Sequence, residues 1–200
     1  MIYAVLVKYK NEVKPLVGTR TVVIDNSENN RGFAKGANLG IKQALGKGAK
    51  RVLLINPDAK ISSADILKLN ENKADIVSPV LKFKREGVDV FDFGGKVNLI
   101  FGRTTHIEKL DPIATLPDDD KELDYISGAC MLVKKEVFEK IGFLDERFFL
   151  YFEDADFSLR AKKAGVNINF ISEIKVFHSV SASTKKLGSP MLLRYHYRNA

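Results

Sequence analysis

A short apolar segment that ends in Asn-Pro-Asp constrains the fold of this chain more than any other feature. Residues 52–55 are all aliphatic, and an apolar run of this length predicts a buried strand. Pro57 has no N–H group to donate to a sheet, so the strand should end there. Asp58 then lies at the carboxyl end of a strand, where open α/β sheets bind their ligands.

Asp58 is open to two interpretations. A carboxylate at a strand end suits a divalent cation that bridges to phosphate oxygens. The other interpretation is a Pro-Asp turn that caps the following helix, since aspartate is common in such turns. This segment alone does not decide between them.

The first half of the chain alternates predicted strands with predicted helices. Apolar and β-branched runs predict strands over residues 2–8, 21–24, 51–55 and 74–80. Helical spacing predicts a helix over residues 34–45, and Ser62 offers an N-cap for a second helix. This alternation predicts an α/β fold with a mixed, mostly parallel sheet and helices on both faces.

The second half of the chain is less regular. We expect a hairpin or meander around Gly94 and Gly95, and then these elements: an acidic loop at 113–122, a strand at 124–134 interrupted by Gly128, helices at 135–141 and 153–164, and strands at 167–171 and 175–178. No repeat, low-complexity segment or linker divides the chain. The sequence therefore predicts one domain over residues 1–200.

Composition excludes several classes of protein. No apolar run approaches the ~18 residues of a membrane span, and the N-terminus lacks the basic region and cleavage site of a signal peptide. Cys130 is the only cysteine, so no internal disulfide forms, as is usual in a reducing cytoplasm. These features predict a cytoplasmic protein, and they leave its oligomeric state open.

The net charge of +7 is unevenly distributed. The chain has no acidic residue after Glu173, while five basic residues follow: Lys175, Lys185, Lys186, Arg194 and Arg198. Such a tail suits phosphates or the anionic inner face of a membrane, or it is an ordinary solvated surface. No RNA-binding or helix-turn-helix signature accompanies it, so we expect no nucleic-acid partner.

Polar side chains follow three of the predicted strands: Lys8 and Tyr9, Asp25 and Asn26, and Asn56 with Asp58. If these strands are parallel, their ends share one edge of the sheet, and a nucleotide can lie across it. Asp25 would accept a hydrogen bond from the base, and Asp58 would hold a metal ion on the diphosphate. A simple Asx turn is the alternative for Asp25.

Residues 30–40 form a glycine-punctuated entry into the first predicted helix. The free N–H groups at a helix N-terminus favour phosphate, and basic side chains add positive charge. The donor-binding residues expected here are Arg31, Gly32, Lys35 and Asn38. The glycine spacing matches neither a Rossmann nor a Walker fingerprint, so an ordinary N-cap loop is the alternative.

An aromatic run over residues 148–152 is followed by Glu153, Asp154 and Asp156. Asp156 has Arg160 one helical turn later, which indicates a structural ion pair. Asp154 has no cation three or four residues later, and apolar surroundings would raise its pKa towards use as a general base. Acids in a first helical turn also complement the helix dipole, which is the alternative explanation.

His178 ends a predicted strand and precedes a small, polar, basic loop at residues 179–188. Such a loop is a candidate lid over a binding site. A purely structural histidine is the alternative for His178.

Taken together, these segments resemble the family 2 inverting glycosyltransferases of GT-A fold, which include bacterial rhamnosyltransferases. The resemblance covers about residues 1–200. It lies in six motifs in order: Val-Ile-Asp-Asn (23–26), Asn-Arg-Gly-Phe-Ala-Lys-Gly-Ala-Asn (30–38), Leu-Ile-Asn-Pro-Asp (54–58), Ser-Gly-Ala-Cys-Met-Leu-Val (127–133), Phe-Leu-Asp-Glu-Arg-Phe-Phe-Leu-Tyr-Phe-Glu-Asp-Ala-Asp (143–156) and Val-Phe-His (176–178).

The resemblance implies metal-dependent transfer of a sugar, with inversion, from a UDP- or dTDP-sugar to a hydroxyl group. Rhamnose is among the candidate sugars. The acceptor would be a glycan or a lipid-linked glycan in surface polysaccharide or glycolipid synthesis, with the protein peripheral at the inner membrane face. About residues 1–80 would bind the nucleotide sugar, and about residues 81–200 would form the acceptor and catalytic half.

The resemblance also implies roles for single residues. Asp25 would bind the nucleobase. Asp58 would be the last acid of an Asp-any-Asp metal motif in which Asn56 replaces the first, and His178 would help to hold Mg²⁺ or Mn²⁺ or the diphosphate. Asp154 would be the catalytic base, with Gly128 and Glu153 on the acceptor side.

The chain departs from the family pattern in two places. Only residues 9–20 join the first two strands, where the family usually has a full helix, and the family often continues beyond the segment that ends this chain. The short crossover is the best support for an alternative function, a non-catalytic nucleotide-sugar-binding paralogue. A sugar nucleotidyltransferase is a further alternative, but residues 8–12 lack its glycine-rich basic signature.

Overall fold

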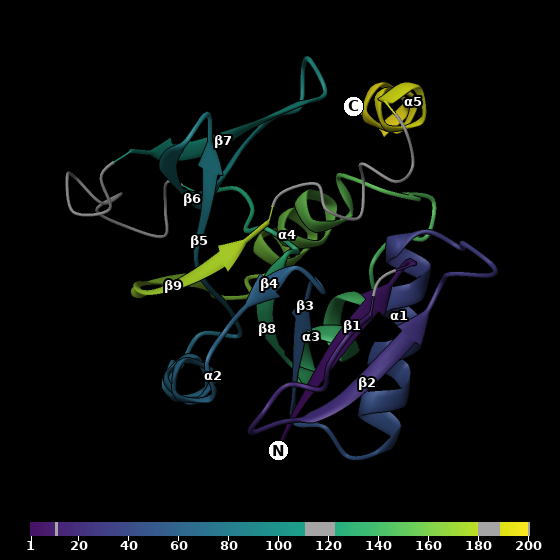
Figure 1. The fold of residues 1–200 in the computed structure, drawn as a ribbon, viewed down its shortest axis with the longest axis vertical. Coiled ribbons are helices and arrows are strands. Elements are labelled where there is room, and N and C mark those ends of the chain that lie inside the picture. The colour runs from purple at the N-terminus through teal and green to yellow at the C-terminus, as the bar shows by residue number, and fades with distance from the viewer. Residues whose placement is uncertain (11, 111–122, 180–188, 200) are drawn as a thin grey trace.

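One curled, mixed sheet flanked by helices forms the centre of the molecule (Figure 1). The computed structural model describes residues 1–10, 12–110, 123–179 and 189–199. The strands are β1 (Ile2–Lys8), β2 (Arg20–Asp25), β3 (Arg51–Ile55), β4 (Ala59–Lys60), β5 (Ile76–Arg85), β6 (Val88–Asn98), β7 (Arg103–Lys109), β8 (Cys130–Lys134) and β9 (Ile168–His178). The helices are α1 (Phe33–Gly46), α2 (Ser63–Glu71), α3 (Lys135–Ile141), α4 (Glu153–Lys163) and α5 (Ser189–Asn199). The predicted α/β class is confirmed.

The strand order explains where the predicted parallel arrangement holds. The strands follow the order β2-β1-β3-β8-β5-β6-β7, with β9 paired to both β4 and β5. β2, β1 and β3 run parallel, so their carboxyl ends share one edge of the sheet as expected. Of the pairings between the described strands, three are parallel and five antiparallel, because β8 and the β5–β6–β7 meander reverse direction.

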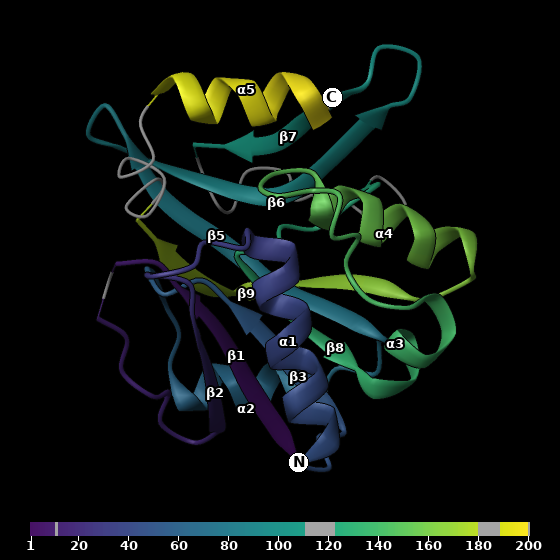
Figure 2. The same ribbon diagram turned by 90° about the vertical axis from the view of Figure 1, so that its right-hand side faces the viewer.

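The two faces of the sheet bury separate apolar clusters. Side chains alternate between the faces of a strand, so Tyr3 and Val5 of β1 pack under α1, α3 and α4, while Ala4 and Leu6 pack towards α2. Figure 2 shows α1, α3 and α4 on the near side of the sheet. Helices therefore cover both faces, as predicted.

Two glycines let α1 lie unusually close to β1. A Cβ atom on Gly40 would lie 2.3 Å from Val5 Cγ1, and one on Gly36 would lie 2.8 Å from Val7 Cγ1. These glycines, which the sequence suggested as part of a phosphate-binding loop, therefore have a packing function.

Several predicted elements differ in the structure. β6 runs straight through Gly94 and Gly95, with one extra residue bulged between Asp92 and Gly95, and the hairpin turn falls at residues 99–102. The two last predicted strands are a single strand, β9, which is irregular opposite Pro79. Of the strand predicted over residues 124–134, only Cys130–Lys134 forms a regular strand, β8. β4 and α5 were not predicted.

The short crossover between β1 and β2 contains no helix in its described residues, 9–10 and 12–19. Val13 and Leu16 instead pack on the apolar cluster beneath α2. The acidic loop expected at 113–122 and most of the lid expected at 179–188 lie outside the described residues. Within the described part of the chain, no helix has the length and apolarity that a membrane span requires.

Candidate functional site

A cavity of about 630 Å³ lies at the carboxyl ends of β1, β2 and β3. Its walls come from the loops after these strands, from β5, β6 and β7 on the other side, and from the start of α4. A cavity of this size is typical of sites for small molecules and cofactors. Most of the motifs identified in the sequence converge on it.

On the side of the parallel strands, Tyr9, Asn26 and Asn56 line the cavity. Asn26 is buried, and its side-chain nitrogen donates to the carbonyl of Gly32 at 2.9 Å. Its Oδ1 atom has no hydrogen-bond partner among the described residues. A buried acceptor without a partner costs about 1–3 kcal/mol, so this atom is suited to a donor group on a ligand.

Lys8 and Asp25 stand beside this cavity and bond to each other. They face each other across the β1–β2 register, and Lys8 Nζ lies 2.7 Å from Asp25 Oδ2. Hydrogen bonds from Lys8 and Ser27 lower the pKa of Asp25 to about 2. Neither side chain belongs to the cavity lining, so the structure places both at its rim.

The entry into α1 is used mainly for packing. The N–H of Phe33 donates to the carbonyl of Phe149 at 2.8 Å, which occupies a group that a phosphate would need. Asn38 is buried and exchanges two hydrogen bonds with the backbone of Leu144. Gly32 lines the cavity. Arg31, Lys35 and Asn38 are not part of the lining: Lys35 is exposed on α1, and the amide of Asn38 is held by Leu144.

Asp58 and His178 are brought together by strand pairing. β4 pairs with β9 so that Ala59 lies opposite His178, and His178 Nε2 lies 3.3 Å from Asp58 Oδ1. Both side chains are mostly buried and line the cavity, and Asn56 Nδ2 lies 3.4 Å from the same imidazole nitrogen.

The Asp58–His178 pair fits a divalent cation. A carboxylate oxygen is an ordinary ligand of both Mg²⁺ and Mn²⁺, whereas an imidazole nitrogen suits a transition metal better than Mg²⁺, so the pair suits Mn²⁺ better than Mg²⁺. The described residues contain no group of three or more His, Cys, Asp or Glu side chains that could hold a metal ion. The two side chains would therefore share such an ion with phosphate oxygens and water.

A strained turn positions the acids at the start of α4. Tyr151 and Phe152 both have positive φ angles, 68° and 71°, which are unfavourable for residues other than glycine. Asn199 of α5 donates to the carbonyls of Leu150 and Tyr151 at 2.8 and 3.0 Å. The turn is held in this conformation from α5, and it directs the next two residues into the cavity.

Asp154 is held by two backbone N–H groups. Its Oδ2 accepts from Gly128 at 2.9 Å, and its Oδ1 accepts from Ala155 at 2.8 Å. Gly128 approaches so closely that a Cβ atom there would lie 3.2 Å from the Asp154 Cβ. Burial raises the pKa of Asp154, while these hydrogen bonds oppose the rise.

Glu153 has the opposite environment. It is buried, it lines the cavity, and its Oε2 atom has no hydrogen-bond partner among the described residues. Burial first, and then the charge of Asp154, raise its pKa to about 8. We therefore assign the proton of this adjacent pair to Glu153 and the negative charge to Asp154.

Asp156 makes the ion pair that its spacing predicted. Arg160 Nε donates to Asp156 Oδ2 at 2.9 Å, and the same guanidinium also donates to the carbonyls of Ile141 and Phe143. This network ties α4 to the end of α3, and Asp156 is not part of the cavity lining.

Sequence reasoning missed a carboxylate–imidazole pair in the opposite wall. Asp92 of β6 and His106 of β7 line the cavity, with His106 Nδ1 3.0 Å from Asp92 Oδ2. The residues are 14 positions apart, and only the bulged register of β6 against β7 brings them together. The one local signal was an aspartate within an otherwise apolar strand pattern, Val90-Phe91-Asp92-Phe93.

The amino-acid sequence is similar to glycosyltransferases, although no protein-family model matches it. The chain is 29% identical over 182 residues to the low-salt glycan biosynthesis hexosyltransferase Agl10 of Haloferax volcanii, covering 87% of this chain and 57% of that relative. It is 29% identical over 252 aligned residues to the dTDP-rhamnosyl transferase RfbF of Shigella flexneri, covering 100% of this chain and 78% of the relative. The chain thus spans little more than half of Agl10.

The fold is similar to that of two solved GT-A enzymes. One is GalNAc-T7 in complex with UDP, GalNAc and Mn²⁺, with a TM-score of 0.61 and 10% identity, covering 89% of this chain and 43% of that one. The other is residues 1–349 of Staphylococcus aureus TarS, with a TM-score of 0.57 and 16% identity. The similarity covers 93% of this chain and 62% of that one. At these identities the similarity concerns the fold alone.

The protonation of Glu153 is testable through stability. Its ordinary pKa is 4.5 and its folded pKa is about 8, so the stability that the neutral form contributes is complete below the first value and is lost as pH rises through the second. Gln does not titrate. We expect the free energy of unfolding of Glu153→Gln, relative to wild type, to increase between about pH 5 and pH 8. Urea unfolding at several pH values measures it.

Glu136→Gln, an exposed change on α3, is the control for the substitution itself. If the free energy of unfolding of Glu153→Gln differs from that of wild type by the same amount at every pH in this range, Glu153 is ionised in the folded protein.

Proposed function

Because the chain belongs to the family 2-like glycosyltransferases of GT-A fold, we propose that it transfers a sugar from a nucleoside-diphosphate donor to a hydroxyl acceptor in glycan synthesis. One observation carries the proposal. A single cavity has Asn56, Asp58 and His178 on one side and Glu153 and Asp154 on the other. These are the groups needed for a diphosphate leaving group and for a hydroxyl nucleophile.

The donor is proposed to lie along the ends of β1, β2 and β3. Tyr9 and Asn26 line that part of the cavity, and the unpartnered Oδ1 of Asn26 is available to an N–H of the base. Asp25 is at the rim, where its charge is maintained by Lys8. Such a donor would be a UDP- or dTDP-sugar; the relative RfbF is named as a dTDP-rhamnosyl transferase.

The diphosphate is proposed to sit beside Asp58 and His178. These two side chains would hold Mg²⁺ or Mn²⁺, and the ion would supply positive charge next to the departing phosphate. GalNAc-T7, which shares the fold, was crystallised with Mn²⁺ and UDP. The side chains of Asp58 and His178 are already adjacent in the protein, so little rearrangement is required.

Asp154 is proposed to be the general base that removes the proton of the attacking hydroxyl. Two N–H groups fix its carboxylate and favour its charged form. The neighbouring Glu153 keeps its own proton and does not compete for that of the acceptor. In this arrangement about residues 1–80 bind the donor together with His178, and the rest of about residues 81–200 supply the acceptor side and the base.

We also propose peripheral contact with an anionic membrane. The turn between β6 and β7 exposes three large apolar side chains, Leu99, Ile100 and Phe101, which are 79%, 88% and 71% exposed. Asn98 Oδ1 accepts from the N–H groups of Ile100 and Phe101, which orders this apolar tip. Figures 1 and 2 both show the tip at the same end of the molecule as α5.

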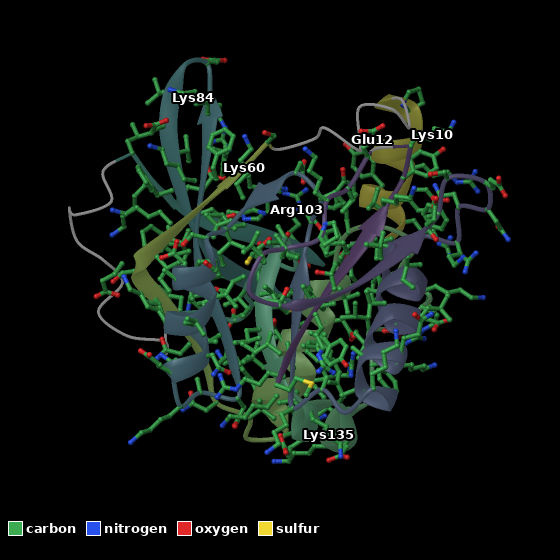
Figure 3. The ribbon with its side chains drawn as sticks, turned by 60° about the horizontal axis from the view of Figure 1, so that its bottom comes forward. Lys10, Glu12, Lys60, Lys84, Arg103 and Lys135 are labelled. Atoms are coloured by element: carbon green, nitrogen blue, oxygen red, sulfur yellow. The ribbon has the colours of Figure 1, made fainter. Side chains whose placement is uncertain are left out.

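Basic residues accompany the apolar tip. Arg103 starts β7 directly after it, and Arg194 and Arg198 are exposed on α5. Lys84, labelled in Figure 3, is not one of them, because it lies by the β5–β6 turn at the other end of β6 and pairs with Asp89. Apolar side chains flanked by positive charge suit the interface of an anionic bilayer, where a lipid-linked acceptor would be found.

The metal site gives the first prediction of this proposal. Asp58→Ala removes the only carboxylate of the Asp58–His178 pair, so we expect Mn²⁺-dependent binding of UDP or dTDP to weaken by at least about 10-fold. Isothermal titration with and without Mn²⁺ measures it. Glu71→Ala, an exposed change on α2, is the control. Unchanged nucleotide affinity of Asp58→Ala in Mn²⁺ would remove Asp58 from the site.

The base gives the second prediction. Asp154→Asn keeps the shape of the side chain but cannot accept a proton, so we expect donor binding to survive and sugar transfer to fall by roughly 10²–10⁴-fold. The release of nucleoside diphosphate, with water or added acceptor, measures it.

Two outcomes of that assay would be decisive. Near-normal turnover by Asp154→Asn, together with an inactive Glu153→Gln, would identify Glu153 as the base. A wild-type protein that binds nucleotide sugar but turns over none of it would favour the non-catalytic paralogue.

The apolar tip gives the third prediction. Burial of one large apolar side chain is worth about 1.5–3 kcal/mol. Replacing Leu99, Ile100 and Phe101 by Ser should therefore weaken binding to phosphatidylglycerol vesicles by at least about 10-fold. Binding of wild type should also weaken with salt. Leu67→Ser, another exposed apolar site, is the control, and co-sedimentation that is equal for all three proteins would refute the contact.

A further inference from the structure

The wall of the cavity that faces the ends of β1, β2 and β3 contains a hydrogen-bonded carboxylate–imidazole pair, Asp92 and His106. Asp92 is 6% exposed. One of its oxygens accepts from the N–H of Gly94 at 2.9 Å, and the other lies 3.0 Å from His106 Nδ1. Since a carboxylate can only accept, Nδ1 carries the hydrogen, and Nε2 is the nitrogen left for another partner.

The surrounding strands fix the ring of His106. The bulge in β6 sets Gly95 opposite His106, and a Cβ atom on Gly95 would lie 2.6 Å from the ring of Tyr125. The missing side chain lets Tyr125 pack against the strand. The Tyr125 ring then meets the imidazole edge to face, with 5.7 Å between centroids. The imidazole is thus held by a hydrogen bond on one side and an aromatic ring on another.

His106 faces the same chamber as the proposed base. Its side chain is 46% exposed although it lines the cavity. The hydrogen bond to Asp92 raises its pKa most, and the charges of Asp154 and Glu108 contribute. The charge of His106 in turn lowers the pKa of Asp154. The two side chains therefore act on each other across the cavity.

The charge of this wall favours a neutral ligand. The cations that the structure describes in this wall all have carboxylate partners: Arg85 makes a two-point pair with Glu108 at 2.7 and 2.9 Å, Lys84 pairs with Asp89, and His106 pairs with Asp92. A phosphate at this wall would find no unpaired cation among these side chains and would lie near the carboxylate of Asp154. A sugar ring carries only hydroxyl groups, which both donate and accept hydrogen bonds.

We propose that His106, positioned by Asp92, binds a hydroxyl of a neutral sugar ring in the acceptor and so holds the reacting hydroxyl towards Asp154. This inference rests on the proposed glycosyl transfer. It assigns the β6–β7 wall to the acceptor sugar and leaves any phosphate of a lipid-linked acceptor outside it.

The test compares transfer to a sugar with hydrolysis of the donor by water. The probes are octyl glycosides of neutral hexoses and 6-deoxyhexoses and, separately, the same glycosides bearing a 6- or 4-phosphate. For His106→Ala we expect the KM for a neutral glycoside to rise and the ratio of transfer to hydrolysis to fall, each about 10-fold, the scale of one lost hydrogen bond. Water needs no sugar contact, so hydrolysis should fall less than transfer.

Two further variants separate positioning from folding. Asp92→Asn, which keeps the shape but not the charge, should raise the same KM, and His106→Gln should restore part of the loss because its amide reaches a similar position. Thr105→Ala is the control, since Thr105 is the neighbour on β7 outside the cavity lining, and it should match wild type in both reactions.

The outcomes distinguish this inference from the broader proposal. Equal losses of transfer and hydrolysis in His106→Ala, or an unchanged KM, would overturn the role of His106. Wild-type preference for phosphorylated glycosides, or binding of no neutral glycoside, would overturn the neutral-sugar wall. A wild type that hydrolyses no nucleoside-diphosphate sugar would instead refute the proposed glycosyl transfer.

Discussion

The position of β8 in the middle of the sheet determines how the site is assembled. β8 pairs antiparallel with β3 along its whole length, with Ile55 opposite Cys130. Its first residue therefore lies at the carboxyl end of β3, and the preceding loop enters the cavity, where the N–H of Asn56 donates to the carbonyl of Ala129. Gly128 in that loop binds Asp154. One antiparallel pairing thus joins the Asn56 and Asp58 side of the cavity to Asp154, the proposed base.

Features that depend on local sequence were predictable. The bounds of β1, β3 and α3 follow directly from aliphatic runs and from the glycine after Ile141. The shared edge of β1, β2 and β3 followed from strand–helix alternation. The Asp156–Arg160 pair followed from helical spacing. In each case the residues that decide the structure are within a few positions of one another.

Features that depend on register between distant strands were not predictable from local pattern. Asp58 and His178 meet through β4 and β9, 120 positions apart, and only the family resemblance linked them. Asn38 was expected to bind the donor because it belongs to a glycine-rich motif. Its amide instead satisfies the backbone of Leu144, 106 positions away. His106 was missed because the bulge that sets it beside Asp92 has no reliable signature in sequence.

The adjacent acids Glu153 and Asp154 show how one turn separates two chemical roles. Successive residues at a helix start point in different directions, and here only Asp154 meets the N–H groups of Gly128 and Ala155. Glu153 is buried without equivalent donors, and two like charges this close are unfavourable. The proton therefore settles on Glu153, which leaves Asp154 charged. The strain at Tyr151 and Phe152 is the structural cost of this arrangement, and α5 helps to maintain it through Asn199.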